Sequence, residues 1–213
     1  MGPVFLLMAM CLVCASAFAQ SSAPSTDAPS ARAHSDQHEG MSVSAEPYSD
    51  AERAKEKFGK ANPIPAGILP VEVLLRNETE QPIHIDISTI QLEVRPHDGA
   101  RQDIDWLTAV EVAAAIAHPE GPAPPKARRF PVGIPMSGTD KRAEKLTEIL
   151  QPLSLNADVV PPKGAIHGFL FFNLSHNMSL AGTASLYLPD ATVIPSSKAL
   201  MFFEVPLGNA PQH

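Results

Sequence analysis

The sequence predicts a mainly β protein, an antiparallel β-sandwich that contains a two-helix insertion. Segments in which apolar and polar residues alternate recur along the chain with turn residues between them, as expected of strands with one wet face. The 22 prolines among 213 residues argue against an all-helical chain, because proline breaks helix interiors. Helical patterns are concentrated between about residues 100 and 152, and this stretch therefore interrupts the strands as an insertion.

Residues 1–19 are predicted to be a cleavable secretory signal. An uncharged apolar run starts at Pro3, and Ala17–Ala19 supplies the small residues that signal peptidase requires. The run is short for a membrane span, which needs roughly 20 apolar residues, so an uncleaved anchor or a buried strand is the less favoured interpretation. Both cysteines, Cys11 and Cys14, lie in this segment, and neither stands in a good lipobox. The mature chain is therefore expected to be extracytoplasmic, either periplasmic or secreted, and to lack disulfides and thiol chemistry.

Residues 20–60 are predicted to form a disordered linker that ends in a short helix. Between residues 20 and 47 the chain has almost no large apolar side chains, so it buries too little surface to offset the entropy of ordering. A helix is expected from Ser49 to Phe58, with Ser49 and Glu52 as a capping box and Gly59 at its C-terminal end. We expect this helix to dock on the domain through Phe58.

The β-sandwich domain is expected to span residues 61–213 and to contain about seven strands. In the first strand, Val71, Val73 and Leu75 fall on one face. Short strands separated by turn signals favour a sandwich of the immunoglobulin-like kind, and a closed barrel, which needs eight or more regular strands, is the alternative. The expected strands are Pro70–Arg76, Ile83–Ile87, Ile90–Val94, Leu153–Val160, Ala165–Leu174, Thr183–Leu188 and Ala199–Leu207.

Two helices are expected in the insertion, which covers about residues 100–152. Thr108 and Glu111 form a capping box ahead of a helix over about Ala109–Ala117, and Pro119 stops it. The second helix is expected over about Asp140–Leu150.

Two of the expected strands are apolar on both faces. Phe169 and Phe171 occupy the second face of one, and Leu200 and Phe202 that of the last strand, where Met201 is on the core side. A strand that is apolar on both sides is normally covered on both sides. We therefore expect the insertion to cover this sheet through the apolar stripe of its second helix, Leu146, Ile149 and Leu150. The alternative interpretation is an exposed apolar patch or a ligand groove.

Two segments carry a resemblance to a known family. Val71–Thr79 is a strand with an asparagine at its turn, and Val160–Gly164 is a turn that precedes the aromatic run Gly168–Phe172. Together they resemble the small exported immunoglobulin-like, or telokin-like, domains of bacteria that are classed as domains of unknown function. The resemblance implies a fold and an extracytoplasmic location. It implies no activity, and no functional residue is carried over.

The sequence shows no catalytic signature. It lacks the nucleophile elbow of a serine hydrolase, a glycine-rich phosphate loop and the paired histidines of a zinc protease. With a formal net charge of -7 and no basic stripe, it is not expected to bind nucleic acid. Pairs such as His34 with His38, or His84 with Asp86, could bind a metal ion, but solvated side chains are the simpler interpretation. We therefore expect no enzyme activity, cofactor or metal site.

Six residues are candidates for ligand binding. Trp106 follows Asp103 and Asp105, an acidic and aromatic cluster that could line a sugar or peptide groove, although the tryptophan could equally seal the core. A proline-rich loop carries a basic cluster that could meet an anionic partner or simply be solvated. The candidates are Trp106, Lys126, Arg128, Arg129, Phe169 and Phe171.

The functional hypothesis is an exported, non-enzymatic module that binds an unknown protein or a component of the cell envelope. It follows from a scaffold with no catalytic signature and one elaborate insertion, since insertions on rigid scaffolds often carry function. The alternative is a carrier that holds a small apolar ligand between the Phe-rich strands and the insertion.

Overall fold

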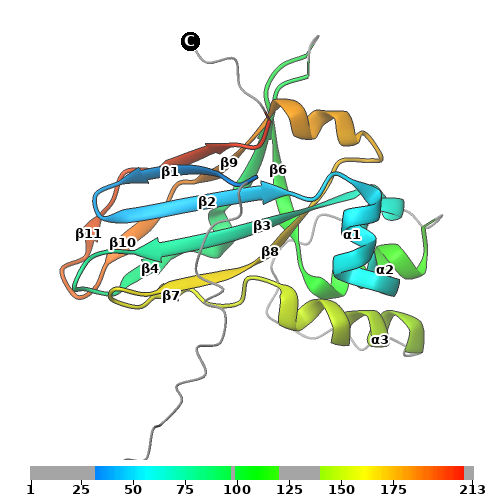
Figure 1. Ribbon diagram of the computed structural model, residues 1–213, viewed down its shortest axis with the longest axis horizontal. Helices are drawn as coiled ribbons and strands as arrows, with labels where there is room; N and C mark the ends of the chain where they lie inside the picture. Colours follow the sequence, from blue (N-terminus) through cyan, green and yellow to red (C-terminus); the bar gives the residue numbers. More distant parts are fainter. Residues whose placement is uncertain (1–31, 97–98, 120–139, 209–213) are drawn as a thin grey trace, which may run out of the picture.

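The computed structural model describes residues 32–96, 99–119 and 140–208, and within them the chain is mainly β and antiparallel (Figure 1). Eight strands form one sheet in the order β1-β2-β3-β8-β6-β5-β9-β12. These strands are β1 (His34–His38), β2 (Met41–Pro47), β3 (Ile68–Asn77), β5 (Gln91–Val94), β6 (Gln102–Leu107), β8 (Ala165–Asn173), β9 (Ala184–Leu188) and β12 (Phe203–Pro206).

A smaller sheet and three α-helices complete the described part of the chain. The four strands of this sheet, in spatial order, are β11 (Lys198–Ala199), β10 (Ala191–Val193), β4 (Ile83–Ile85) and β7 (Val159–Val160). The α-helices are α1 (Ala51–Phe58), α2 (Ala109–Ala117) and α3 (Lys141–Leu150), and they lie together at one end of the large sheet (Figure 1). The short 3₁₀ turns are η1 (Gly59–Ala61), η2 (Ile64–Ala66), η3 (Ile87–Thr89), η4 (Gln151–Leu153) and η5 (Met178–Thr183).

The large sheet is continuous and curls back on itself. Strand β6 pairs with β8 at Trp106 and Leu107, and it pairs with β5 over its other end, so no break divides the sheet into two. The two end strands lie side by side, because the Asp36 carboxylate of β1 accepts a hydrogen bond from the backbone N–H of Glu204 in β12 at 3.1 Å. We call this contact between β1 and the 198–204 segment the seam.

The inner face of the large sheet and the small sheet share one hydrophobic core. Because side chains alternate along a strand, the predicted inward set Val71, Val73 and Leu75 of β3 is fully buried, which confirms that prediction. Phe172 and Phe203 are among the largest side chains in this core. Each such burial stabilises the fold by roughly 1.5–3 kcal/mol relative to an exposed side chain.

A second hydrophobic cluster joins the helices to the outer face of β3 and β8. Phe169 and Phe171 are buried there against Leu146 and Leu150 of α3, which confirms the prediction that the insertion covers this strand. The predicted role of Ile149 is wrong, since 41% of its surface is exposed. Helix α1 and residues of α2 also contribute to the cluster, so the cover has three helices rather than two.

The helix starts follow the capping chemistry of the sequence, with one shift. The Thr108–Glu111 capping box is present as predicted, and both of its hydrogen bonds form. Helix α1 is capped by Asp50 and not by Ser49, because the Asp50 carboxylate accepts from the N–H of Arg53 at 2.8 Å. The prediction of Ser49 as the cap is therefore wrong by one residue, and serine and aspartate are similarly good N-caps.

Several predictions about element boundaries are wrong. The predicted disordered linker contains β1 and β2, a hairpin in which Met41, Val43 and Ala45 are fully buried. The predicted insertion begins with a strand, β6, and its helical part starts only after Thr108. The strand expected over Leu153–Val160 is limited to the two residues of β7. In each case pairing with neighbouring strands decides the structure, and such long-range pairing leaves little trace in local periodicity.

None of the helices in residues 32–96, 99–119 and 140–208 has both the length and the apolarity needed to cross a membrane.

Candidate binding surface

Three of the six predicted binding residues lie in or against the interior. Trp106 is half-buried on the inner core, and its indole N–H donates to the backbone carbonyl of Ile87 at 2.9 Å. Phe169 and Phe171 are only 3% and 1% exposed, and the rings of Tyr48 and Phe58 pack around them. The sealing role of Trp106 and the core role of the two phenylalanines are therefore the interpretations that match this geometry. Lys126, Arg128 and Arg129 lie outside the described residues.

A polar cluster beneath α1 is the first candidate for chemistry. Glu46 of β2 and Glu72 of β3 are cross-strand partners. Arg53 of α1 forms an ion pair with Glu46 at 2.5 Å, and Lys57 forms one with Glu72 at 3.6 Å. The Tyr48 hydroxyl donates to Glu72 at 2.8 Å, and the Arg53 guanidinium lies 3.8 Å from the centre of the Tyr48 ring.

This polar cluster anchors α1 and is not poised for catalysis. Burial, and then the hydrogen bond to the Glu72 carboxylate, raise the pKa of Tyr48 to about 12, so the phenol remains a protonated donor. Each carboxylate is matched with a cation of α1. General acid–base catalysis works best with groups that titrate near the working pH. The cluster instead holds α1 against β2 and β3, where Phe58 enters the second hydrophobic cluster.

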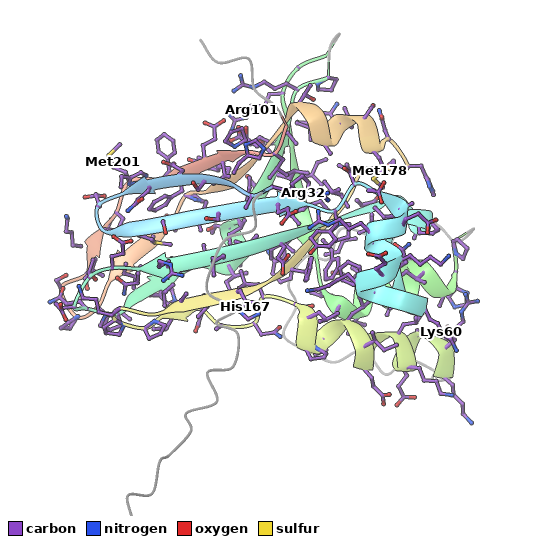
Figure 2. All side chains as sticks on the ribbon, in the orientation of Figure 1. Arg32, Lys60, Arg101, His167, Met178 and Met201 are labelled. Carbon is purple, nitrogen blue, oxygen red and sulfur yellow. The ribbon has the colours of Figure 1, made fainter. Side chains whose placement is uncertain are left out.

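The outward side of β6, β5, β9 and β12 forms a second candidate surface, which we call the open face. Its side chains alternate with the buried ones of the inner core, and the second hydrophobic cluster includes no residue of β5, β9 or β12. In Figure 2, Arg101 lies at the top and Met201 at the upper left, whereas Lys60 beside α1 lies at the lower right. The open face consists of Gln91, Glu93, Asp103, Asp105, Ser185, Tyr187, Phe202 and Glu204.

The strand register places these side chains in rows. Gln91 of β5 is paired with Asp105 of β6 on one side and with Tyr187 of β9 on the other. Tyr187 is in turn paired with Glu204 of β12. A single row across four strands therefore reads Asp105, Gln91, Tyr187, Glu204, and the Gln91 amide donates to the Asp105 carboxylate at 3.0 Å.

An exposed apolar cluster lies at the β12 end of this row. The rings of Tyr187 and Phe202 are 5.6 Å apart between centroids, and Met201 precedes Phe202 in the chain. Phe202 is 48% exposed and Met201 is 61% exposed. Their predicted positions are therefore corrected, since Met201 does not enter the core and none of the helices that the structure describes covers Phe202. The strand begins only at Phe203, so the period-two pattern does not extend back to Met201.

The open face is acidic. The buried carboxylate of Glu93 forms an ion pair with Arg101, which also binds Asp103 at 3.1 Å. Burial raises the pKa of Glu93, the Arg101 guanidinium lowers it, and the nearby charges of Glu204 and Asp103 raise it further. The upward direction prevails, and burial of the Glu93 carboxylate is its largest cause.

Side chains of β1 and of the turn that follows it contact the backbone of the apolar cluster at the seam. The Glu39 carboxylate accepts from the N–H of Met201 at 2.7 Å and binds the Lys198 ammonium at 3.1 Å. His38 Nε2 lies 3.0 Å from the carbonyl oxygen of Phe202, and its ring stacks on the buried Phe203 at 3.9 Å. The hydrogen bond from Met201, followed by that from Lys198, lowers the pKa of Glu39. The two ends of the sheet are thus joined by carboxylate and imidazole side chains that contact backbone groups, and not by a ladder of main-chain hydrogen bonds.

The described residues contain no group of three or more His, Asp or Glu side chains that could hold a metal ion.

The candidate surface carries little signal in the sequence. Tyr187 lies on the outward face of β9, and a single aromatic residue on a wet strand face gives no further signal in the sequence. Phe202 is predicted to be covered because its expected strand is apolar on both faces, and its 48% exposure shows that this prediction is wrong. The strand pairing that brings Tyr187 beside Phe202 and Glu204 joins β9 to β12, and it depends on tertiary structure.

Comparison with known proteins gives no relative: no family model matches the chain, and no curated protein or solved structure matches it. The resemblance to exported immunoglobulin-like domains stays a prediction.

Proposed function

We propose that this chain is an exported, non-enzymatic binding module of the cell envelope, and that it binds a protein or another envelope component through the open face. The extracytoplasmic location rests on the apolar N-terminal run that ends in Ala17–Ala19. Sequencing the N-terminus of the secreted or periplasmic protein tests the location, and the expected first residue is Gln20. Retention of residues 1–19 in the cytoplasm would contradict it.

One observation carries the assignment of the binding surface. Phe202 and Met201 are large apolar side chains left exposed beside Tyr187, on a sheet face that has a packed core behind it. Aromatic residues and methionine are enriched in protein interfaces, where they supply most of the apolar contact area. The seam also holds the backbone of these two residues through Glu39 and His38, which lowers the entropy cost of binding.

The immunoglobulin-like assignment of the fold is part of the same proposal. The two segments that carry the resemblance belong to neighbouring strands, since Val71 is paired with Leu170 in the β3–β8 ladder. Their turns also meet, because the backbone N–H of Asn77 donates to the carbonyl of Gly164 at 2.9 Å. Exported domains of this kind commonly act as binding scaffolds on which loops and one sheet face make the contacts.

A pair of variants tests the binding surface. Phe202→Ser removes an exposed aromatic ring from the open face, and Val110→Ser removes an exposed apolar side chain from α2 at the far end of the molecule. Each immobilised variant is incubated with solubilised envelope, and the retained components are quantified against the wild-type protein. We expect Phe202→Ser to lose components that Val110→Ser retains. Equal retention by both variants would refute the assignment of this face.

The carrier alternative stays a prediction. The rings of Tyr48 and Phe58 pack on Phe169, in the region where this alternative places the ligand.

A further inference from the structure

We propose that the open face binds a cationic, extended segment of a partner protein that carries an apolar side chain between its basic residues. This inference rests on the proposed function and specifies the chemistry of the partner.

The first argument is the charge balance of the face. Four carboxylates, those of Glu93, Asp103, Asp105 and Glu204, belong to the open face. In the part of the chain that the structure describes, Arg101 forms ion pairs with Glu93 and Asp103, and the other two carboxylates form none. Asp105 is matched only by the neutral amide of Gln91, and among residues 32–96, 99–119 and 140–208 the Glu204 carboxylate has no hydrogen-bond or ion-pair partner.

The second argument is the spacing of the two uncompensated carboxylates. Asp105 and Glu204 stand at the two ends of one row, with three strand spacings between them. Strands are about 4.8 Å apart, so their backbones are about 14 Å apart. An extended peptide rises about 3.3 Å per residue, and this distance therefore corresponds to about four residues of a segment that crosses the strands.

The third argument is what lies between the two charges. Tyr187 stands in the row next to Glu204, and the Phe202 ring is in contact with it. An apolar side chain of the partner can pack on these rings, and a lysine or arginine can approach their faces through a cation–π contact. The face thus offers an anionic group at each end of the row, with the aromatic cluster beside the Glu204 end, and is complementary to two basic residues with an apolar residue between them.

The negative charges of the open face disfavour two other possible occupants, a second copy of this chain and an anionic component of the envelope. A second copy would bring acidic faces together, in a chain whose formal net charge is -7. Anionic envelope polymers and lipid headgroups would meet the same repulsion.

The experiment uses short labelled peptides that alternate phenylalanine with lysine, and a matched set that alternates phenylalanine with glutamate. Binding to the full mature chain is followed by fluorescence anisotropy at low and high salt. Three variants are compared: Asp105→Asn with Glu204→Gln, which removes two charges at nearly constant shape; Phe202→Ser; and Glu144→Gln with Glu148→Gln, which removes two exposed charges from α3. Thermal unfolding shows that each variant is folded.

The expected result is binding of the lysine peptide, little binding of the glutamate peptide, and weakening by salt. The Asp105/Glu204 variant should bind the lysine peptide roughly three- to tenfold more weakly, because two exposed ion pairs are lost. The α3 variant should match the wild-type protein.

The other outcomes separate the two proposals. Loss of binding in Phe202→Ser together with unchanged binding in the Asp105/Glu204 variant overturns the cationic partner and keeps the open face. Two further outcomes would also overturn the cationic partner and keep the open face: preference for the glutamate peptide, and self-association of the protein that Phe202→Ser abolishes. Binding that none of the open-face variants alters overturns both.

Discussion

Asn77 joins two turns of the molecule, and its substitution gives a demanding test of the fold. The side chain is 1% exposed at the end of β3. Its oxygen accepts from the N–H and the hydroxyl of Thr79 at 2.8 and 2.7 Å. Its amide donates to the carbonyls of Gln81 at 2.7 Å and of Val160 at 3.3 Å. One side chain therefore fixes the turn after β3 and ties it to β7.

The size of the effect follows from these four bonds. A hydrogen bond contributes a net of about 0.5–1.5 kcal/mol, so their loss in Asn77→Ala costs between about 2 and 6 kcal/mol. Thr79 and Gln81 lie near the surface and can bond to water instead, which places the expected loss in the lower half of that range, at about 3 kcal/mol. For a chain of this size such a loss lowers the midpoint of thermal unfolding by about 6–12 °C.

The assay is urea unfolding monitored through the single tryptophan, Trp106, which packs against the inner core. Asn156→Ala is the matched control, because Asn156 is exposed and bonds to Gln151 at 2.8 Å. It should lose less than about 1 kcal/mol. A further variant, Asn77→Asp, keeps the acceptor but turns an oxygen toward two carbonyls, so at neutral pH it should be at least as unstable as Asn77→Ala. A loss below about 1 kcal/mol in Asn77→Ala, or a milder effect of aspartate than of alanine, would refute this role.

Two further predictions concern the seam and the cover of the sheet. The pKa of Glu39 is lowered by the N–H of Met201 and by Lys198, so its carboxylate contributes stability above its unfolded pKa that is lost as the pH falls through the folded one. Glu39→Gln should therefore be less stable than wild type at neutral pH, and the difference should vanish in acid; urea midpoints that differ equally from about pH 7 to about pH 3 would count against it. Phe58→Ala should cost about 3–5 kcal/mol, because the ring is buried between α1 and the Phe-rich strand, whereas the exposed Val110→Ala should change unfolding by less than about 0.5 kcal/mol. Similar urea midpoints for these two variants would show that α1 is not part of the cover.

The sequence predicted those elements whose stability is decided locally. The alternation of Val71, Val73 and Leu75 gave β3, and the Thr108 capping box gave the start of α2, because both signals act within a few residues. The β1–β2 hairpin was not predicted from the sequence. Its strands contain Ser, His and Asp, which have low β propensity, and only Met41, Val43 and Ala45 face the core. Pairing with β3 orders this hairpin, and that information is not local.

The candidate surface was unpredictable for a related reason. Phe169 and Phe202 look alike in the sequence, since each is an aromatic residue opposite a core-facing one. Phe169 is buried and Phe202 is exposed because three helices pack on β3 and β8, whereas the second hydrophobic cluster does not extend to β9 or β12. Only the spatial order of the strands separates the two halves of the outer face.

The spatial order of the strands also explains why the exposure of Phe202 points to a role in binding. On the covered half of the sheet, an outward phenylalanine is buried by α1 and α3, and it stabilises the fold. On the open half, the other outward side chains are polar or partly polar, as Glu204, Tyr187 and Ser185 are, and an exposed ring contributes nothing comparable to folding. Nevertheless, Glu39 and His38 bond to the backbone of Met201 and Phe202 and hold this segment beside Tyr187. A half-exposed aromatic side chain on a segment whose backbone is hydrogen-bonded in place fits a surface built for a partner, and the acidic residues around it fit our proposal that the partner is basic.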